Sequence, residues 1–241
     1  MKVAIISDIH ANLVPLEAVV GDLLRRDVNR VVCLGDVATL GAQPRQVLDL
    51  LQAAHWSFVM GNHDAAVLAP VEASDLHIPA ELMKAIEWSS AQITDGQRDF
   101  IRTFRNTCTV QIAQSTEICC YHGSPEVSYE LVLPTMSEDE FTRVFHSTKA
   151  EILAGGHIHQ QLLRRFGNRT VMNPGSVGSA WLWNGEAQAP TLMPWAEYAV
   201  VEVAEGATRI EMIQIPFDTE KAKRQIADTD SPMRDWWLTQ Y

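Results

Sequence analysis

Long apolar runs are missing from this sequence of 241 residues. No stretch approaches the ~18 uninterrupted apolar residues of a membrane-spanning helix, which argues against a membrane protein. The N-terminal stretch MKVAIISD is too short for the hydrophobic core of a signal peptide and is more typical of a first buried strand. We therefore expect a cytoplasmic protein with no membrane partner.

Cysteine is also scarce: there are four, at positions 33, 108, 119 and 120, and none has the CxxC spacing. A chain of this length can bury a substantial core and does not need disulfide bonds for stability. The four cysteines are therefore predicted to be buried free thiols in a reducing compartment, which agrees with a cytoplasmic location.

Positive charge is the third deficit. The chain has 19 Lys and Arg against 30 Asp and Glu, a formal net charge of −11, and never more than two basic residues in a row. This balance argues against sequence-independent binding of nucleic acid or of an anionic membrane. A small anionic substrate stays compatible with it, because a bound metal ion can reverse the local field.

Strand-like and helix-like patterns alternate at the start of the chain. Residues 13–26 and 45–54 have the apolar spacing of amphipathic helices, and each lies between two apolar β-type runs. This alternation predicts parallel strands joined by right-handed crossovers. The predicted strands are residues 3–7, 30–34, 57–60, 107–113, 116–121, 150–154, 162–166, 169–172, 197–203 and 208–215.

The rest of the chain divides into a helical stretch and a strand-rich stretch. Residues 78–105 have a purely helical pattern, and strands dominate after residue 106, with a hairpin predicted at Gly167-Asn168. No linker or repeat indicates a second domain. We expect a single α/β domain over residues 1–241, with a helical cap insertion at about 65–105.

Polar clusters follow five of the predicted strands directly. In open α/β sheets, ligands bind beyond the carboxyl ends of the strands, so these clusters are expected at one edge. The Asp-x-His and His-x-His spacings place two side chains on the same side of an extended backbone. The candidate ligands are Asp8, His10, Asp36, Asn62, His122, His157 and His159.

This set of imidazoles and oxygen donors predicts a metal centre. Without thiolate ligands it suits Mn²⁺, with Fe, Zn²⁺, Ni²⁺ or Co²⁺ as alternatives. Seven ligands are too many for one ion with an open position and fit two ions that share a carboxylate. Two such ions typically clamp a phosphate about 3.5–4 Å apart and generate a hydroxide near neutral pH.

Each of these residues also has an ordinary structural explanation. Asp8 and Asp36 could cap helices or shape turns, and His122 could be a buried histidine with its hydrogen bonds satisfied. Independent structural explanations for all seven residues together are improbable, so we favour the metal centre.

The ordered motifs SDIHAN, GDVATLG, GNHD, YHGSP, GGHIH and NPGSVG resemble the calcineurin-like metallophosphoesterase superfamily, especially its compact bacterial and archaeal branch. The resemblance runs from Met1 to about Gly178. It implies a four-layer αββα sandwich with two metal ions at the strand ends, and a hydroxide held between the ions that attacks phosphorus in line.

The resemblance also implies a role for each residue. One ion would bind Asp8, His10 and His159, and the other would bind Asn62, His122 and His157. Asp36 would bridge the two ions. His63 would stand near the leaving group and protonate it, with Asp64 as the expected partner that orients the imidazole.

The sequence departs from the phosphoprotein phosphatases of the superfamily. Thr39 and Leu40 replace the Asp that orients the catalytic His and the Arg that grips phosphate, and Met60 replaces a second Arg. The NPGSVG motif is followed by the Trp-rich loop 181–195. Its rings, Trp181, Trp183 and Trp195, could stack on a nucleobase or pack against the core or a second subunit.

These departures favour small, nucleotide-like phosphodiesters or phosphomonoesters as substrates. The expected partners are such a small phosphorylated substrate and a second copy of the chain in a homodimer. A phosphoprotein phosphatase, a catalytically silent metal-binding scaffold and a nuclease are the alternatives. The nuclease is disfavoured because the net charge of −11 offers no cationic channel for nucleic acid.

Overall fold

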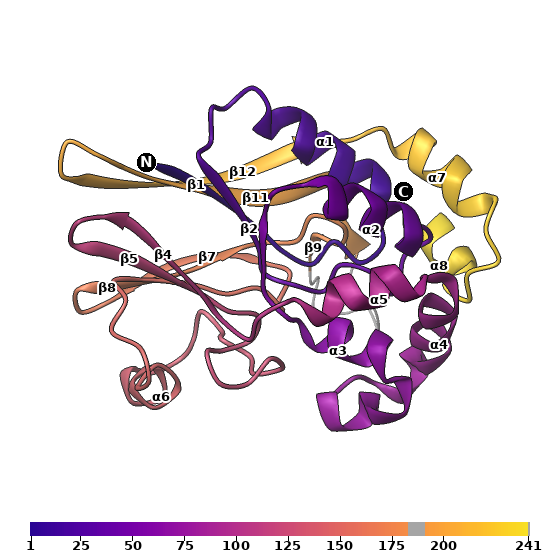
Figure 1. Cartoon of the computed structure of the whole chain (residues 1–241), viewed down its shortest axis with the longest axis horizontal. Helices are drawn as coiled ribbons and strands as arrows, with labels where there is room; N and C mark the ends of the chain where they lie inside the picture. Colours follow the sequence, from indigo (N-terminus) through magenta and orange to yellow (C-terminus); the bar gives the residue numbers. More distant parts are fainter. Residues whose placement is uncertain (183–190, 241) are drawn as a thin grey trace.

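The computed structural model describes residues 1–182 and 191–240 and shows a mixed α/β fold built on two five-stranded sheets, which lie one above the other in Figure 1. The first sheet has the strand order β12-β11-β1-β2-β3, and the second has the order β4-β5-β6-β8-β7. The strands of the first sheet are β1 (Lys2–Ile6), β2 (Arg30–Cys33), β3 (Ser57–Phe58), β11 (Trp195–Ala204) and β12 (Ala207–Pro216). Those of the second are β4 (Cys108–Ala113), β5 (Thr116–Cys120), β6 (Ile152–Ala154), β7 (Gln161–Phe166) and β8 (Arg169–Pro174).

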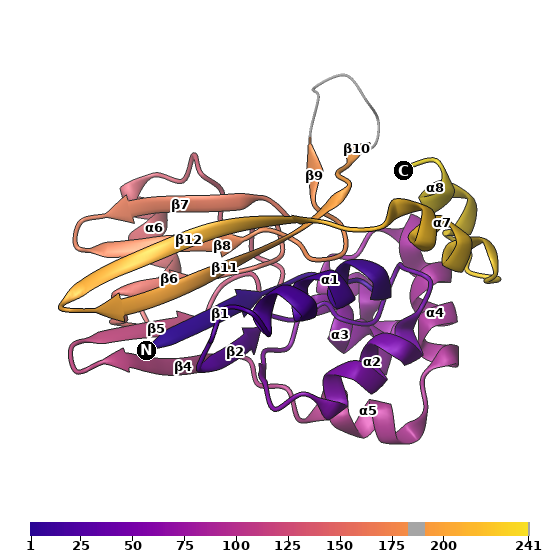
Figure 2. The same ribbon diagram turned by 90° about the horizontal axis from the view of Figure 1, so that it is seen from above.

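The helices lie on the two outer faces and at one end of the sheets (Figure 1). The α-helices are α1 (Leu13–Leu23), α2 (Pro44–Ala53), α3 (Asn62–Leu68), α4 (Met83–Gln92), α5 (Asp95–Arg102), α6 (Glu138–Val144), α7 (Thr219–Ala227) and α8 (Arg234–Leu238). Two 3₁₀ segments, η1 (Pro70–Leu76) and η2 (Ala80–Leu82), precede α4. Figure 2 shows the same arrangement from above, with α1 and α2 beside the first sheet.

Alternation of apolar side chains along the strands produces the layers. On β1, Ala4 and Ile6 pack with α1 and α2, whereas Val3 and Ile5 point into the space between the sheets. In the second sheet, Cys120 faces that same space, and Cys119 faces α6. Both sheets are therefore covered on both faces, and the predicted four-layer αββα sandwich is confirmed.

Pairing of the strands agrees with the sequence patterns. β1, β2 and β3 are parallel neighbours, as their alternation with helices predicted, and each of the ten predicted strands has a counterpart. The hairpin predicted at Gly167-Asn168 joins β7 to β8, and Gly167 has a φ of 57° that favours glycine. The four cysteines are free, and only Cys108 is partly exposed.

Local structure differs from the sequence patterns at three places. The predicted strand 57–60 is formed only at residues 57–58, and the GNHD motif directly begins helix α3. Strands dominate after residue 106, as predicted, but this part also contains α6, which starts with a capping box between Ser137 and Glu140. Both helices have seven residues, too short for a strong hydrophobic period.

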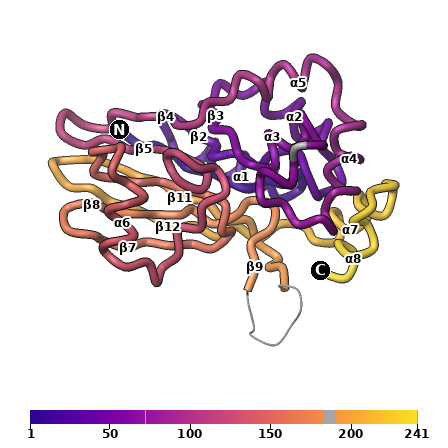
Figure 3. Tube along the Cα trace, turned by 90° about the horizontal axis from the view of Figure 1, so that it is seen from below, coloured from indigo at the N-terminus to yellow at the C-terminus, as the bar shows by residue number. Residues whose placement is uncertain are grey.

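A short hairpin of β9 (Trp181–Leu182) and β10 (Thr191–Leu192) was not predicted. It projects away from the two sheets, on the same side of the molecule as α8 (Figure 3). Among the described residues, no helix has the length and apolarity needed to cross a membrane.

Candidate metal centre

The predicted ligands come together at the carboxyl ends of strands from both sheets. Asp8 and His10 follow β1, Asp36 follows β2, and Asn62 starts the helix after β3. From the second sheet, His122 follows β5, and His157 and His159 follow β6. Every one of the seven except His157 and His159 is buried, and those two are half-buried. Residues scattered over 150 positions of the chain thus share one buried cluster.

The backbone at these positions is unusual. Among the described residues, ten that are not glycine have a positive φ, and five of them are predicted ligands. Left-handed backbone is uncommon for residues with a side chain and is concentrated at functional sites. The five are Asp8, His10, Asp36, His157 and His159.

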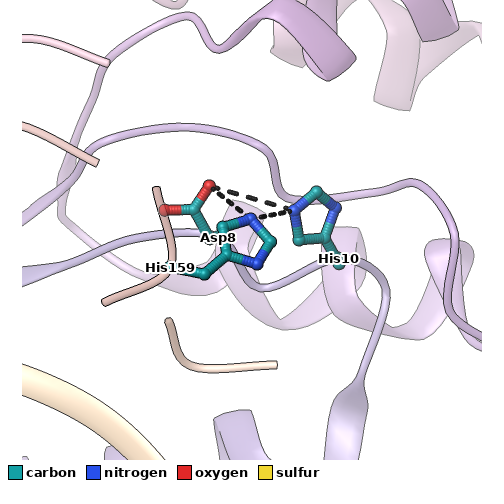
Figure 4. Close-up of side chains that lie close together, drawn as sticks. All are labelled: Asp8, His10 and His159. Carbon is teal, nitrogen blue, oxygen red and sulfur yellow. Dashed lines mark hydrogen bonds and ion pairs between the residues drawn. The ribbon is translucent and has the colours of Figure 1, made fainter. Parts of the chain in front are cut away.

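Asp8, His10 and His159 form the first donor group, shown in Figure 4. The Nε2 atoms of His10 and His159 are 3.0 Å apart. Asp8 Oδ1 lies 3.3 Å from His159 Nε2 and 3.8 Å from His10 Nε2. Three donor atoms from the segments after β1 and β6 therefore face one point.

Asp36, His122 and His157 form the second donor group. Asp36 Oδ2 lies 3.2 Å from His122 Nε2 and 3.9 Å from His10 Nε2, so this carboxylate contacts a histidine of each group. Asp8 Oδ1 also lies 3.9 Å from His122 Nε2. The two groups are therefore adjacent, with carboxylate oxygens between them.

Hydrogen bonds on the far side of the rings set which nitrogen faces the cluster. His122 Nδ1 donates to the carbonyl of Leu34 at 2.8 Å, and His159 Nδ1 donates to the carbonyl of Ser179 at 3.2 Å. A carbonyl can only accept, so in the neutral rings Nε2 carries a lone pair. These lone pairs face carboxylate oxygens, an arrangement that needs a cation or an extra proton between them.

Unpartnered polar atoms fit the same requirement. Within residues 1–182 and 191–240, Asp8 Oδ1, Asn62 Oδ1 and His122 Nε2 are buried and make no hydrogen bond. Buried polar atoms without partners are rare in native proteins. The Asn62 side-chain nitrogen donates to the carbonyl of Leu76 at 3.2 Å, so its oxygen is the group that a cation would meet. The donor set therefore fits divalent metal ions.

Charges in the cluster shift the histidine pKa values in opposite directions. Burial alone would lower the pKa of His122, but the carboxylates of Asp36 and Asp8 raise it to about 10. Burial and the neighbouring His122 lower the pKa of His157 to about 4. In the metal-free protein at pH 7, His122 therefore carries a proton, and His157 is a neutral ligand.

His63 lies beside the first donor group, and its ring is 5.1 Å from that of His10. Its Nδ1 is 3.1 Å from the hydroxyl of Thr39, and its main-chain N–H donates to Asp36 Oδ1 at 2.9 Å. Burial lowers the pKa of His63, although the carboxylate of Asp36 opposes the shift. The imidazole is therefore neutral at pH 7.

The expectation that Asp64 orients His63 was wrong. Asp64 Oδ2 accepts the main-chain N–H groups of Asp36 (2.7 Å) and Gly61 (3.0 Å), and Oδ1 accepts that of Val37 (2.9 Å). As the third residue of α3, Asp64 points back at the start of its own helix and at the turn after β2. Asp64 therefore links the turn that carries Asp36 to the helix start that carries Asn62. The group that contacts the His63 ring is the Thr39 hydroxyl.

Sequence reasoning missed the supporting roles of Thr39 and Ser179, although Thr39 lies in the motif GDVATLG and Ser179 directly follows NPGSVG. Ser176, within NPGSVG, also supports the site, because its hydroxyl donates to the carbonyl of Asp8 at 2.7 Å. Leu34 gave no signal, because its contribution is a main-chain carbonyl that any residue would supply.

The Trp-rich loop is only partly described. Trp181 packs with an apolar cluster that includes Leu192, Ile226 and Trp237. Trp195 donates its indole N–H to Glu197 at 3.0 Å. Trp183 lies outside the described residues.

The sequence profile of the calcineurin-like phosphoesterase superfamily domain matches residues 1–205. The chain belongs to this superfamily. Among curated proteins, MJ0912 of Methanocaldococcus jannaschii is 26% identical over 247 residues, which cover 95% of this chain and 93% of the relative. The resemblance stated from the motifs is therefore confirmed.

Solved structures agree with the superfamily fold. A metallophosphoesterase from Sphaerobacter thermophilus has a TM-score of 0.73 at 23% identity and covers 100% of this chain and 97% of its own. Protein PH1004 from Pyrococcus horikoshii OT3 has a TM-score of 0.80 at 18% identity, and the match covers 99% of this chain and 96% of PH1004. Together with the two donor groups, superfamily membership makes this calcineurin-like protein a metal-dependent phosphoesterase.

Proposed function

We propose that the protein hydrolyses phosphodiester or phosphomonoester bonds of small, nucleotide-like substrates with the help of two divalent cations. The observation that carries the proposal is the position of the Asp36 carboxylate, which contacts a histidine of each donor group. Asp8, His10 and His159 would hold one cation, Asn62, His122 and His157 the other, and Asp36 both. Mn²⁺ is the proposed metal, because the donors are imidazole and oxygen.

When bound, the cations neutralise phosphate charge and supply a water-derived nucleophile near neutral pH. The protein's own side chains position the reacting groups and supply the proton for the leaving oxygen. His63 is neutral and holds its Nδ1 against Thr39, so Nε2 is the atom that would give a proton to the leaving oxygen. Asp36 Oδ1 fixes the main chain of His63 beside the donor groups.

Three departures from the phosphoprotein phosphatase motifs bear on substrate size. Thr39, Leu40 and Met60 stand where phosphoprotein phosphatases of the superfamily carry Asp and Arg, so the phosphate grip of those enzymes is absent at these positions. With a net charge of −11, the protein also offers little attraction to long polyanions. Both features favour small substrates over phosphoproteins and nucleic acids.

Removal and restoration of metal tests the function directly. Chelator-treated protein should lose at least about 100-fold of its activity on bis(p-nitrophenyl) phosphate, and Mn²⁺ should restore it, since the cations supply the nucleophile. Fe²⁺, Zn²⁺, Ni²⁺ and Co²⁺ serve as comparisons. No turnover with any of these metals would refute the proposal.

A substrate screen then compares the substrate classes. The panel contains cyclic nucleotides, dinucleoside polyphosphates, phosphomonoesters and a phosphopeptide. A preference for the phosphopeptide would refute the small-substrate assignment.

Metal binding should also depend on pH. His122 has a pKa of about 10 in the metal-free protein, so a cation that binds its Nε2 at pH 7 must displace a proton. Apparent affinity should therefore rise with pH, by about tenfold per unit for each proton displaced, and fall as the solution becomes acidic. Calorimetric titrations at pH 6, 7 and 8, in buffers of different ionisation enthalpy, measure both the affinity and the released protons. An affinity that does not change over this range would contradict the prediction.

A further inference from the structure

Thr39 touches two imidazoles at once. Its side chain is fully buried in the loop after β2, and its hydroxyl lies 3.1 Å from His63 Nδ1 and 3.4 Å from His10 Nδ1. The two rings are nearly perpendicular, at 89°. A hydroxyl has a single hydrogen to donate, so it must play different roles toward two similar nitrogen atoms.

The surroundings of His10 decide those roles. Its Nε2 faces Asp8, Asp36 and His159 and must present a lone pair if it holds a cation. The ring hydrogen of His10 is then on Nδ1 and is donated to the Thr39 oxygen. The hydroxyl hydrogen is left for Nδ1 of His63, which must accept it. The neutral His63 ring then carries its own hydrogen on Nε2.

We propose that Thr39 is a positioning residue that sets the tautomer of His63, through a chain of hydrogen bonds from His10 Nδ1–H to the Thr39 hydroxyl and on to His63 Nδ1. This inference rests on the proposed role of His63 as proton donor. It places the transferable hydrogen on Nε2, the nitrogen that Thr39 does not hold. It also couples the metal ligand His10 to the proton donor through one uncharged group.

The loop holds Thr39 in place by contacts that do not involve its hydroxyl. The Gly41 main-chain N–H donates to the Thr39 carbonyl at 2.8 Å, and the Trp237 indole N–H donates to the Leu40 carbonyl at 2.8 Å. The β-branched side chain is itself stiff about χ1. Thr39→Val keeps this shape and removes only the hydroxyl, so it isolates the hydrogen-bond chain. Thr39→Ser keeps the hydroxyl and removes the methyl group.

Nitrogen chemical shifts read the tautomer without any activity. In the full-length protein labelled with ¹⁵N-histidine and loaded with diamagnetic Zn²⁺, His63 should show an unprotonated Nδ1 and a protonated Nε2. In Thr39→Val the two tautomers should both be populated, and Thr39→Ser should restore the wild-type pattern. A proton on Nδ1 of His63 in the wild-type protein would overturn the proposal, as would an unchanged tautomer in Thr39→Val.

Kinetics give a second readout. Thr39→Val should lower kcat on an alkyl phosphodiester by about 10–100-fold, the usual range for a group that supports a reactive residue, with KM and metal content little changed. Thr39→Ser should recover most of the loss. Thr148→Val is the matched control, because the Thr148 hydroxyl accepts the main-chain N–H of Ala150 next to β6 and contacts neither His10 nor His63. Wild-type kcat in Thr39→Val, or no recovery in Thr39→Ser, would contradict the proposal.

Failure of this inference is distinguishable from failure of the proposed function. If His63 is not the proton donor, a His63→Ala variant will lose equal activity on good and poor leaving groups, whatever Thr39 does. The ¹⁵N shifts of His63 still decide whether Thr39 sets its tautomer.

Discussion

Asp36→Asn is expected to lower kcat/KM by about 10³-fold or more. Even a residue that only hydrogen-bonds to a metal ligand typically lowers metal affinity or activity by about 10–100-fold when it is mutated, and Asp36 is a proposed ligand itself. Asp36 Oδ2 lies 3.2 Å from His122 Nε2 and 3.9 Å from His10 Nε2. An amide has the same shape but no charge, and its nitrogen cannot bind a cation. Elemental analysis should show fewer than two bound metal ions per chain, and the circular dichroism spectrum should match that of the wild type.

Asp22→Asn is the matched control for that variant. Asp22 is also a buried carboxylate, but it lies on α1 and accepts hydrogen bonds from Arg25, Arg26 and Tyr198. Its loss should lower stability without changing the metal content or the kcat of the folded protein. Two bound ions and full turnover in Asp36→Asn would contradict the shared-carboxylate arrangement.

Asp36 illustrates what could be predicted from the sequence. Its motif and those of the other ligands follow apolar runs, and the ends of parallel strands converge at one edge of a sheet. The strands were predictable because alternate positions serve two different cores, as Ala4 and Val3 show on β1. The position of the donor cluster thus depends mainly on local patterns that the sequence displays.

Features that depend on tertiary contacts were beyond prediction. Helix α3 begins at Asn62 because Asp64 accepts main-chain N–H groups from its own helix start and from the distant turn after β2. No local period in a seven-residue helix reports such a contact. The same holds for the Leu34 carbonyl that orients His122, since a main-chain group leaves no mark on residue identity.

The partner of His63 shows how adjacency in sequence can mislead. Asp64 is next to His63, but successive residues on a helix point in directions about 100° apart and do not face each other. Thr39 is 24 positions away and reaches His63 Nδ1 because the turns after β2 and β3 lie side by side. The phosphatase motif GDxVDRG has an Asp that orients the catalytic His at the position of Thr39. This correspondence indicates the contact of Thr39 with His63 better than the adjacency of Asp64 does.

His63→Ala is expected to show the second large effect, with a size that depends on the leaving group. A proton donor matters most when the departing oxygen is strongly basic, so the loss should be about 10²–10⁴-fold on an alkyl phosphodiester and under about tenfold on a p-nitrophenyl ester. His63 is neutral and buried, and its main chain is fixed by Asp36. The plot of log kcat against leaving-group pKa should therefore become steeper in the variant, while the metal content stays at the wild-type value.

His146→Ala serves as the control, because this exposed histidine lies on the surface beside Glu126 and should leave the plot unchanged. Parallel plots for His63→Ala and the wild-type protein would mean that His63 acts on bound phosphate and not on the departing oxygen. The proton would then have to come from solvent, and the rate of the wild-type enzyme should fall steeply with leaving-group pKa. Since His63 is neutral at pH 7 with one ring hydrogen to give, a shallow wild-type slope that steepens only when His63 is removed is the result that identifies it as the donor.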